Sequence, residues 1–396
     1  MLTHHFPPYS IGGIGTFCHD LSEALAKNGI SVTVVAGTPA GAVRRSFRTA
    51  KDETNPRIVR VGNMTFSPLH VWFQLMNSNT LLRLISEADI VHGQDASSFP
   101  LVYFSHRRNQ EQPWAVTVHS GPASELYYAL RSVGPHRSGP SFGDFIRSGV
   151  GFPSWDVALR GDAKYADMLV PVSQTLSVEI ERYLTINPKK LITIPTGVNI
   201  ELLNTLAHLG YTQRKSNKVR LFWAGRFNWR KGIIHLVKSL FHLVHDVGFT
   251  NFEMQLFGQG PLEHRVEQLV SRMNLNNYVK IRGFVTYEQL ISAESTSDVV
   301  CFPSLYEASP VGMIEGMSLG KPIVAFNAAY AREILGEYPF PLATTVQDYA
   351  NSLHRMCISE DLRQKCGAYL QGRARDLYDI RKVADSYSRL FEKMLS

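Results

Sequence analysis

The 396-residue chain lacks long apolar runs and is poor in cysteine. No stretch approaches the roughly 18 consecutive apolar residues that a membrane-spanning helix requires. Residues 1–8 contain no basic segment leading into an apolar core, so we expect no secretory signal peptide and a cytoplasmic protein. The cysteines, Cys18, Cys301, Cys357 and Cys366, are scattered and form no C-x-x-C pair. This spacing argues against a zinc site or a disulfide framework and favours buried free thiols.

Three motifs for nucleotide or metal binding are also absent: G-x-x-x-x-G-K-[ST], D-x-D and a complete G-x-G-x-x-G. The run Gly12–Gly15 (GGIG) lies between the first expected strand and the first expected helix. Cys18 stands where the third glycine of a dinucleotide fingerprint would fall, and no clear ribose-binding acid follows the segment 32–36. A nicotinamide-dependent oxidoreductase is therefore disfavoured. The glycines still suit a phosphate at a helix N-terminus, and equally a tight turn with close helix packing.

The composition is that of a globular protein, with 44% hydrophobic and 19% charged residues. The formal net charge of +7 suggests an anionic partner, which nucleic acid, an acidic membrane surface or a phosphorylated ligand would supply. The sequence contains no nucleic-acid-binding signature, so we expect no nucleic-acid partner. A basic cluster at 44–48 and an aromatic, apolar segment at 69–76 could contact an anionic membrane peripherally. An exposed loop and a partly buried helix are the favoured explanation of these segments.

Short, apolar, β-branched runs alternate with helix-length segments along the whole chain, which is typical of parallel sheets covered on both faces. We therefore expect an α/β protein with two doubly wound, Rossmann-like domains. The first expected strand, residues 1–4, is very short unless the protein begins upstream. The other expected strands are 30–36, 88–92, 115–119, 168–172, 191–194, 219–224, 252–257, 279–281, 299–303 and 322–325.

The first helix and the domain boundaries are readable from local patterns. Leu21, Ala24 and Leu25 form a helical apolar stripe, and Asn28-Gly29 is a typical helix end. A turn at 194–199, followed by the polar stretch 212–218, predicts the boundary between the two domains. We expect an N-terminal domain over 1–198, a C-terminal domain over 199–378 and a final amphipathic helix within 379–396.

Two cations follow the first strand of the second domain. Arg226 and Lys231 lie in the loop after the strand 219–224, at the carboxyl edge where α/β sheets bind ligands. Fixed cations there could neutralise a diphosphate leaving group, a task for which no D-x-D motif would supply a metal. Two solvated basic residues on a loop are the simpler alternative.

Two carboxylates follow the strand 299–303. We expect a helix to begin near Ser309-Pro310, which leaves Glu307 in the loop and places Glu315 about two turns into the helix. They could hold two hydroxyl-bearing parts of one ligand. Glu307 could instead be an acid that stabilises a helix N-terminus. Glu315 has only small and apolar neighbours on its helix, and a bound ribose would give it a polar partner.

In order and spacing, these features closely resemble the retaining glycosyltransferases of family 4 (glycosyl transferases group 1), which have the GT-B fold. Two glutamates separated by seven residues, here Glu307 and Glu315, are the hallmark of that family. The resemblance extends over nearly the whole chain, although Thr196 and Asn199 depart from the family's usual Asn-Gly-Val-Asp turn. Further matching segments are 9–15, 117–121 with His119, 170–173, 194–198, 225–232 and 283–285.

The resemblance implies two domains that face each other across a donor-binding cleft, with the last helix packed on the first domain. Arg226 and Lys231 would bind the donor diphosphate, Glu315 the ribose, and Glu307 the donor sugar. His119 would contact that sugar at its 6-hydroxyl.

Backbone groups would complete the donor site, as the resemblance implies. Those at Phe284 and Val285 would recognise the base, and Gly12 and Gly13 would lie beside the diphosphate. The sugar and phosphate would be bound by Ser309, Pro310, Val311 and Gly312.

We therefore expect a retaining enzyme that transfers a hexosyl group from a nucleoside-diphosphate sugar to a hydroxyl acceptor on a glycan, lipid or small molecule. It would need neither a metal nor another cofactor, with His119, Arg226, Lys231 and Glu307 as catalytic residues. A nucleotide-sugar epimerase of GT-B shape and a non-catalytic nucleotide-sugar-binding subunit are the alternatives. The nucleotide, the sugar and the acceptor stay open.

Overall fold

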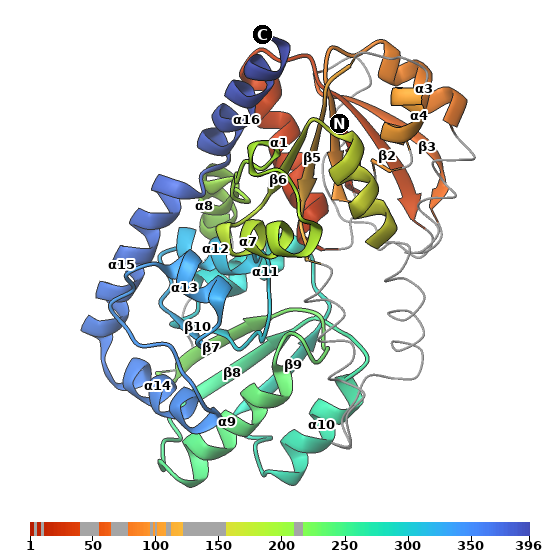
Figure 1. Ribbon diagram of the computed structural model, residues 1–396. Helices are drawn as coiled ribbons and strands as arrows, with labels where there is room; N and C mark the ends of the chain where they lie inside the picture. The colour runs from red at the N-terminus through yellow and green to blue at the C-terminus, as the bar shows by residue number, and fades with distance from the viewer. Residues whose placement is uncertain are drawn as a thin grey trace. The chain divides into compact units, whose positions relative to one another are not determined.

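The computed structural model describes residues 1–3, 6–8, 12–39, 55–64, 78–95, 98–99, 101–107, 112–121, 156–209 and 217–396. They form two compact units, coloured along the chain in Figure 1. Unit 1 contains the described residues up to Val198 together with Ile380–Ser396, and unit 2 contains the described part of Asn199–Asp379. Within these ranges no helix is long and apolar enough to cross a membrane. The segments 44–48 and 69–76 lie outside the described residues.

Unit 1 is built on a six-stranded parallel sheet with the strand order β3-β2-β1-β4-β5-β6. The order reverses between β1 and β4, so the loops after these strands meet where such sheets bind ligands. The strands are β1 Leu2–Thr3, β2 Thr33–Pro39, β3 Arg57–Met64, β4 Val91–Gln94, β5 Trp114–Val118 and β6 Met168–Pro171. The helices include α1 Gly13–Lys27, α3 Ser78–Ser86, α4 Leu101–Arg107, α7 Gln174–Leu184 and α16 Ile380–Leu395.

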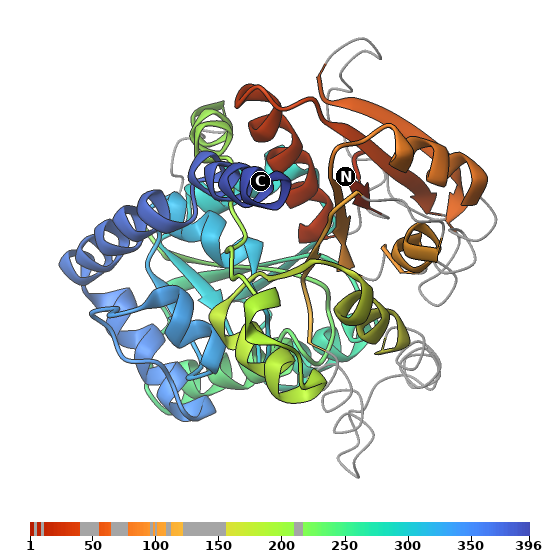
Figure 2. The same ribbon diagram turned by 45° about the horizontal axis from the view of Figure 1, so that its top comes forward.

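The helices α1 and α16 lie side by side on this sheet, in red and dark blue in Figures 1 and 2. The expected stripe of α1 is confirmed, since Leu21 and Leu25 are buried in the core cluster of unit 1. Gly29 follows the helix at φ 85°, a left-handed conformation that glycine adopts without a steric penalty. Tyr387 and Leu390 of α16 join the same cluster, so the C-terminal segment of the chain covers the first sheet.

Unit 2 contains a five-stranded parallel sheet with the order β11-β10-β7-β8-β9. Its order reverses between β7 and β10. The strands are β7 Val219–Ala224, β8 Phe252–Phe257, β9 Val279–Gly283, β10 Val299–Phe302 and β11 Ile323–Ala325. The helices are α8 Ile200–Leu209, α9 Ile233–His245, α10 Glu263–Arg272, α11 Tyr287–Ser295, α12 Val311–Ser318, α13 Ala329–Leu335, α14 Val346–Ile358 and α15 Glu360–Leu377.

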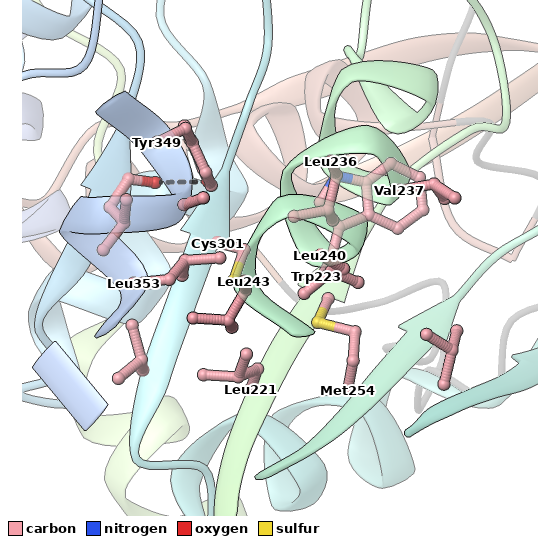
Figure 3. Packing of buried hydrophobic residues seen from close by; sticks show 14 of the residues in the cluster. Leu221, Trp223, Leu236, Val237, Leu240, Leu243, Met254, Cys301, Tyr349 and Leu353 are labelled. Atoms are coloured by element: carbon pink, nitrogen blue, oxygen red, sulfur yellow. Dashed lines mark hydrogen bonds between the residues drawn. The ribbon is translucent and has the colours of Figure 1, made fainter. Parts of the chain in front are cut away.

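The strands β7, β10 and β11 of unit 2 are buried over most of their length and have apolar residues on both faces. Leu221 and Trp223 of β7 belong to one core cluster, in which they pack with Leu240 of α9 (Figure 3). Phe222 alternates to the opposite face, where its ring lies 5.3 Å from that of Phe257. This two-sided burial explains why the strands read as continuous apolar runs in the sequence.

Most expected strands are confirmed with shifted ends, but one expectation was wrong and one strand was missed. The segment 191–194 forms only a single bridge, Leu191 to Leu169. Ile194 N–H donates to the carbonyl of Pro171 (3.2 Å), but Pro171 has no N–H to donate in return, which interrupts the ladder. The missed strand, β3, is at the edge of its sheet, and it contains Arg57 and Arg60 among its apolar residues. The expectation of buried free thiols holds for all four cysteines.

The core of unit 2 leads to a stability prediction. Leu240 is completely buried on α9, and truncation to alanine would leave a cavity among well-packed neighbours. We expect Leu240→Ala to lower the free energy of unfolding by about 3 kcal/mol in urea denaturation. The matched control on the exposed face of the same helix, Lys238→Ala, should change it by less than about 0.5 kcal/mol. Equal effects of the two variants would contradict the packing described here.

Candidate active site

The backbone of the loop between β7 and α9 is held by hydrogen bonds to the segment between β8 and α10. Phe227 is fully buried, its N–H donates to the carbonyl of Gln259 (3.0 Å), and its carbonyl accepts from Leu262 N–H (2.9 Å). Near the end of the loop, the side chain of Asn228 accepts a hydrogen bond from Lys231 N–H (3.1 Å). These contacts hold Lys231 immediately before the helix that follows.

A glycine lets this loop touch the loop after β10. Gly232 has φ 65°, and a Cβ atom placed on it would lie 1.9 Å from the carbonyl oxygen of Pro303. Both the backbone conformation and the close approach therefore require glycine. Beside this contact, Leu305 N–H donates to the carbonyl of Arg230 (2.8 Å). The two loops flank the point at which the strand order of unit 2 reverses.

Lys231 and Glu307 form an ion pair between these loops, with 2.6 Å between Nζ and Oε1. The side chains are 23% and 8% exposed, so water screens the pair only weakly. Burial alone would raise the pKa of Glu307, but the charges of Lys231 and Arg230 and hydrogen bonds from Lys231 and Ser304 outweigh it, and the pKa is lowered. Glu307 is therefore an ionised carboxylate with a positively charged partner.

Glu315 lies on α12, and a tyrosine contacts it. The helix begins at Val311, after Pro310 as N-cap, so Glu315 is its fifth residue. The expected depth of two turns was therefore too large, because Ser309 and Pro310 precede the helix. Glu315 is buried, and its Oε1 accepts a hydrogen bond of 2.6 Å from the hydroxyl of Tyr287, the first residue of α11. The sequence offered no partner for this carboxylate, and the structure supplies one.

A second buried acid, Glu294, lies next to α12. Burial, and then the negative charge of Glu315, raises its pKa well above the ordinary value, while Lys321 opposes the shift. Gly316 makes room for this side chain, since a Cβ atom there would lie 2.9 Å from Glu294 Oε1. The environment of Glu294 therefore favours the neutral acid, whereas that of Glu307 favours the carboxylate.

The start of α12 has the features of a helix N-terminus that binds anions. Pro310 makes no side-chain cap, and no acidic residue occupies the first turn. Ser309 and Val311 are half-buried, and Gly312 is exposed. The N–H groups of a helix start combine with its positive dipole end to attract phosphate or hydroxyl oxygens.

The other expected residues of unit 2 lie in loops. Phe284 and Val285 follow β9, directly before the segment that contains Tyr287, and Phe284 is 51% exposed. Arg226 is exposed early in the loop after β7, and its side chain forms no ion pair with another described residue. The structure thus joins Lys231 to Glu307 directly, while a phosphate-binding role of Arg226 stays a prediction.

Unit 1 contains the three remaining expected residues. Gly12 and Gly13 are exposed at the start of α1, where Gly12 has φ 104° and the first turn has no acidic residue. His119 follows β5. Its backbone N–H donates to the side-chain Oδ1 of Asp95 (2.8 Å). Its ring nitrogen Nε2 lies 2.8 Å from Oε1 of Gln94.

Sequence reasoning missed five polar residues that shape these sites: Gln94, Asp95, Asn228, Tyr287 and Glu294. For Gln94 and Asp95 a signal existed, since polar residues at the carboxyl end of a buried strand mark the ligand-binding edge of an α/β sheet. Asn228 lies within a loop already singled out. Tyr287 and Glu294 gave no local signal, because only the packing of α11 beside α12 gives them a role.

Comparisons with known proteins place the chain in a family. The family model "Glycosyltransferase Family 4" matches residues 11–202, and the model "Glycosyl transferases group 1" matches residues 211–373. One similar protein is the MMP alpha-(1->4)-mannosyltransferase of Mycolicibacterium hassiacum, which is 23% identical over 97% of this chain and 95% of its own length.

Solved structures show the same fold. Sucrose-phosphate synthase from Thermosynechococcus elongatus has a TM-score of 0.74 at 19% identity and covers 99% of this chain and 98% of its own. Anabaena HepE in complex with UDP-glucose has a TM-score of 0.72 at 16% identity, with coverage of 99% and 98%. These likenesses confirm the GT-B fold class expected from the sequence.

The ion pair between Lys231 and Glu307 leads to a prediction about pH. The pKa of Glu307 is below its ordinary 4.5, so its stabilising contribution is present above that pH and is lost as the pH falls through the lowered value. Lys231→Met removes the nearest positive charge, and burial should then raise the pKa of Glu307. We expect the variant to lose about 3 kcal/mol of unfolding free energy at pH 7, and less at pH 4, where Glu307 becomes protonated.

Urea denaturation at pH 7, pH 5 and pH 4 measures these differences. The double variant Lys231→Met/Glu307→Gln is the control, because it lacks both charges and should show the same difference from the wild type at pH 7 as at pH 5. A loss in Lys231→Met that stays constant from pH 7 to pH 4 would contradict the ion pair's role.

Proposed function

The chain belongs to the group 1 glycosyltransferases of family 4, with the GT-B fold, and we propose that it transfers a hexosyl group with retention at the anomeric carbon. The donor in this proposal is a nucleoside-diphosphate sugar, and the acceptor is a hydroxyl group of a glycan, lipid or small molecule. HepE, of the same fold, is described in complex with UDP-glucose, and the relative from M. hassiacum is named a mannosyltransferase. Both names support a nucleotide-linked hexose as the donor.

The Lys231–Glu307 ion pair is the observation on which the proposal mainly rests. A buried charge needs a partner at all times. In the proposal, the donor diphosphate becomes the partner of Lys231, and Glu307 turns to the hydroxyl groups of the donor sugar. Both charges then stay satisfied with the donor bound and without it. Arg226, on the same loop, is proposed as a second cation for the diphosphate.

We assign the ribose to Glu315. Tyr287 donates to one oxygen of this carboxylate, which fixes the orientation of the side chain. The start of α12, with Ser309 to Gly312, would bind sugar and phosphate oxygens through backbone N–H groups. The backbone at Phe284 and Val285, on the same segment as Tyr287, would recognise the base.

The proposed reaction exchanges one C–O bond for another on the same face of the sugar. The bond between the anomeric carbon and the diphosphate oxygen breaks, and the acceptor oxygen forms the new bond. The acceptor's proton passes to the departing diphosphate, so no base on the opposite face is needed. Lys231 and Arg226 stabilise the charge that develops on the leaving group, which is the task a metal performs in other transferases. Metal independence is part of this proposal.

Unit 1 contributes His119 and the glycine turn in this proposal. His119 would contact the donor sugar at its 6-hydroxyl, and Gly12 and Gly13 would approach the diphosphate at the start of α1. The fixed backbone of His119, held by Asp95, and the acid-free first turn of α1 support these assignments.

A donor panel tests the proposal. Nucleoside diphosphate release would be measured for uridine, guanosine and adenosine diphosphate hexoses, with and without candidate acceptors, and the anomeric configuration of the product would be read by NMR. We expect release that depends on acceptor and a product with the donor's configuration. Conversion of the donor without release would identify an epimerase, and binding without conversion of any donor would identify a non-catalytic subunit. An inverted product would refute retention.

Lys231→Ala tests the role of the cation in that assay. Loss of a preorganised charge stabiliser should reduce kcat by about 100-fold or more. Lys238→Ala removes an exposed lysine from α9 and should keep the wild-type rate. Unchanged kcat in Lys231→Ala would contradict the assignment of Lys231 to the leaving group.

A further inference from the structure

The segment between β10 and Glu307 is held from two sides. Pro303 and Leu305 contact the loop that follows β7. Between them, the carbonyl of Ser304 accepts a hydrogen bond of 2.8 Å from the hydroxyl of Tyr330, the second residue of α13. The backbone of three consecutive residues is therefore fixed shortly before Glu307.

Tyr330 reaches Ser304 because the strands that precede these two residues are neighbours. Phe302 of β10 lies opposite Ala325 of β11 in the parallel register, so the segments after both strands begin at the same carboxyl edge of the sheet. Tyr330 is buried, and its ring lies 6.3 Å from that of Phe302. Since a carbonyl oxygen can only accept, the tyrosine hydroxyl is the donor to Ser304.

The side chain of Ser304 connects this contact to Glu307. Both residues are buried, with exposed fractions of 2% and 7%. The hydroxyl of Ser304 donates a hydrogen bond to the carboxylate, which favours the ionised form and helps to lower the pKa of Glu307. A carboxylate can only accept, so the serine gives its single hydroxyl hydrogen to this bond. Ser304 is thus held at its carbonyl by Tyr330, and it holds Glu307 with its hydroxyl.

The hydrogen bond from Tyr330 does not involve the loop that contains Lys231. The contacts of the segment with that loop are made by Arg230 and Gly232, which flank Lys231 in the sequence. In the proposed reaction, Lys231 leaves Glu307 for the diphosphate, and a movement of its loop would act on these two contacts first. The hydrogen bond from α13 keeps the serine in place through such a movement. The buried carboxylate then still has a donor when the lysine is gone.

We propose that Tyr330 is a positioning residue for Glu307 and acts on it through Ser304. It keeps the carboxylate directed at the donor sugar while Lys231 binds the diphosphate. This inference deepens the proposed function and, for its effect on the donor, rests on it. The hydroxyl of Tyr330 thereby contributes to the binding of the sugar without contacting it.

Two substitutions and their combination test whether Tyr330 acts through Ser304. Tyr330→Phe removes the hydroxyl and keeps the ring beside Phe302. Ser304→Ala removes the hydroxyl that donates to Glu307 and keeps the carbonyl that accepts from Tyr330. If the serine hydroxyl transmits the effect, Tyr330→Phe should change nothing further once Ser304→Ala is present. Substitutions that disturb the site independently would instead have additive effects.

Carbon NMR of the ligand-free, ¹³C-glutamate-labelled protein measures the effect on the carboxylate directly, with Glu307 assigned through the Glu307→Gln variant. In the wild type, the carboxyl carbon should titrate below the ordinary pKa of 4.5. Ser304→Ala and Tyr330→Phe should each raise this midpoint, because a hydrogen bond that favours the ionised form is lost or loosened. The double variant should have the midpoint of Ser304→Ala alone.

The matched control is Tyr338→Phe. It removes another tyrosine hydroxyl that is hydrogen-bonded to backbone, at Ile323 (2.9 and 3.1 Å), the first residue of β11 and therefore at the strand end opposite the candidate site. It should leave the midpoint of Glu307 unchanged. An unchanged midpoint in Tyr330→Phe, or a rise that adds in full to that of Ser304→Ala, would overturn the proposal.

The consequence for binding is specific to the donor sugar. Tyr330→Phe should raise the Kd of the nucleotide sugar identified in the donor panel by about tenfold, the effect of one misplaced hydrogen bond, and should leave the Kd of its nucleoside diphosphate unchanged. Equal weakening of both ligands would indicate a general structural defect and would refute the positioning role. Because the titration of Glu307 uses no ligand, it is independent of whether the protein transfers a sugar. Absence of transfer with the midpoints as stated would refute the proposed function alone.

Discussion

The ion pair of Lys231 and Glu307 is the interaction on which the candidate site of the second unit depends. It joins loops that follow two strands far apart in the sequence and adjacent in the sheet. The pair can form only because Gly232 allows the backbone of one loop to reach Pro303 of the other. The parallel sheet, its reversal of strand order and one glycine therefore combine to hold two opposite charges where such sheets bind ligands.

The buried acids Glu307, Glu315 and Glu294 differ in the charges and hydrogen-bond donors that surround their carboxyl groups. Glu307 has a cation beside it and is ionised. Glu315 is held by the hydroxyl of Tyr287, and the charge of Glu315 helps to keep its buried neighbour Glu294 neutral. Glu307 is thus paired with a lysine, while the orientation of Glu315 is held by a tyrosine. A ligand with a diphosphate between two hydroxyl-bearing groups matches that pattern.

The sequence allowed much of the fold and of the candidate site to be predicted, because parallel sheets covered on both faces produce recognisable apolar runs. The order and spacing of several motifs, with Glu307 and Glu315 among them, likewise predicted the family, which the comparisons confirm. The edge strand β3 was missed because its arginines break the apolar run. The contacts of Tyr287 with Glu315, and of Tyr387 with Thr117, join residues distant in the sequence, and no local pattern encodes such pairs.

Calorimetric titration of the two glutamate variants with two ligands tests the central claim that each glutamate binds a different part of one donor. The ligands are the nucleoside diphosphate released in the donor panel and the intact nucleotide sugar. Glu315→Gln should weaken the binding of both by about tenfold or more, since both contain the ribose. Glu307→Gln should weaken only the nucleotide sugar. Equal weakening of both ligands by Glu307→Gln, or unchanged nucleoside diphosphate affinity in Glu315→Gln, would contradict the account.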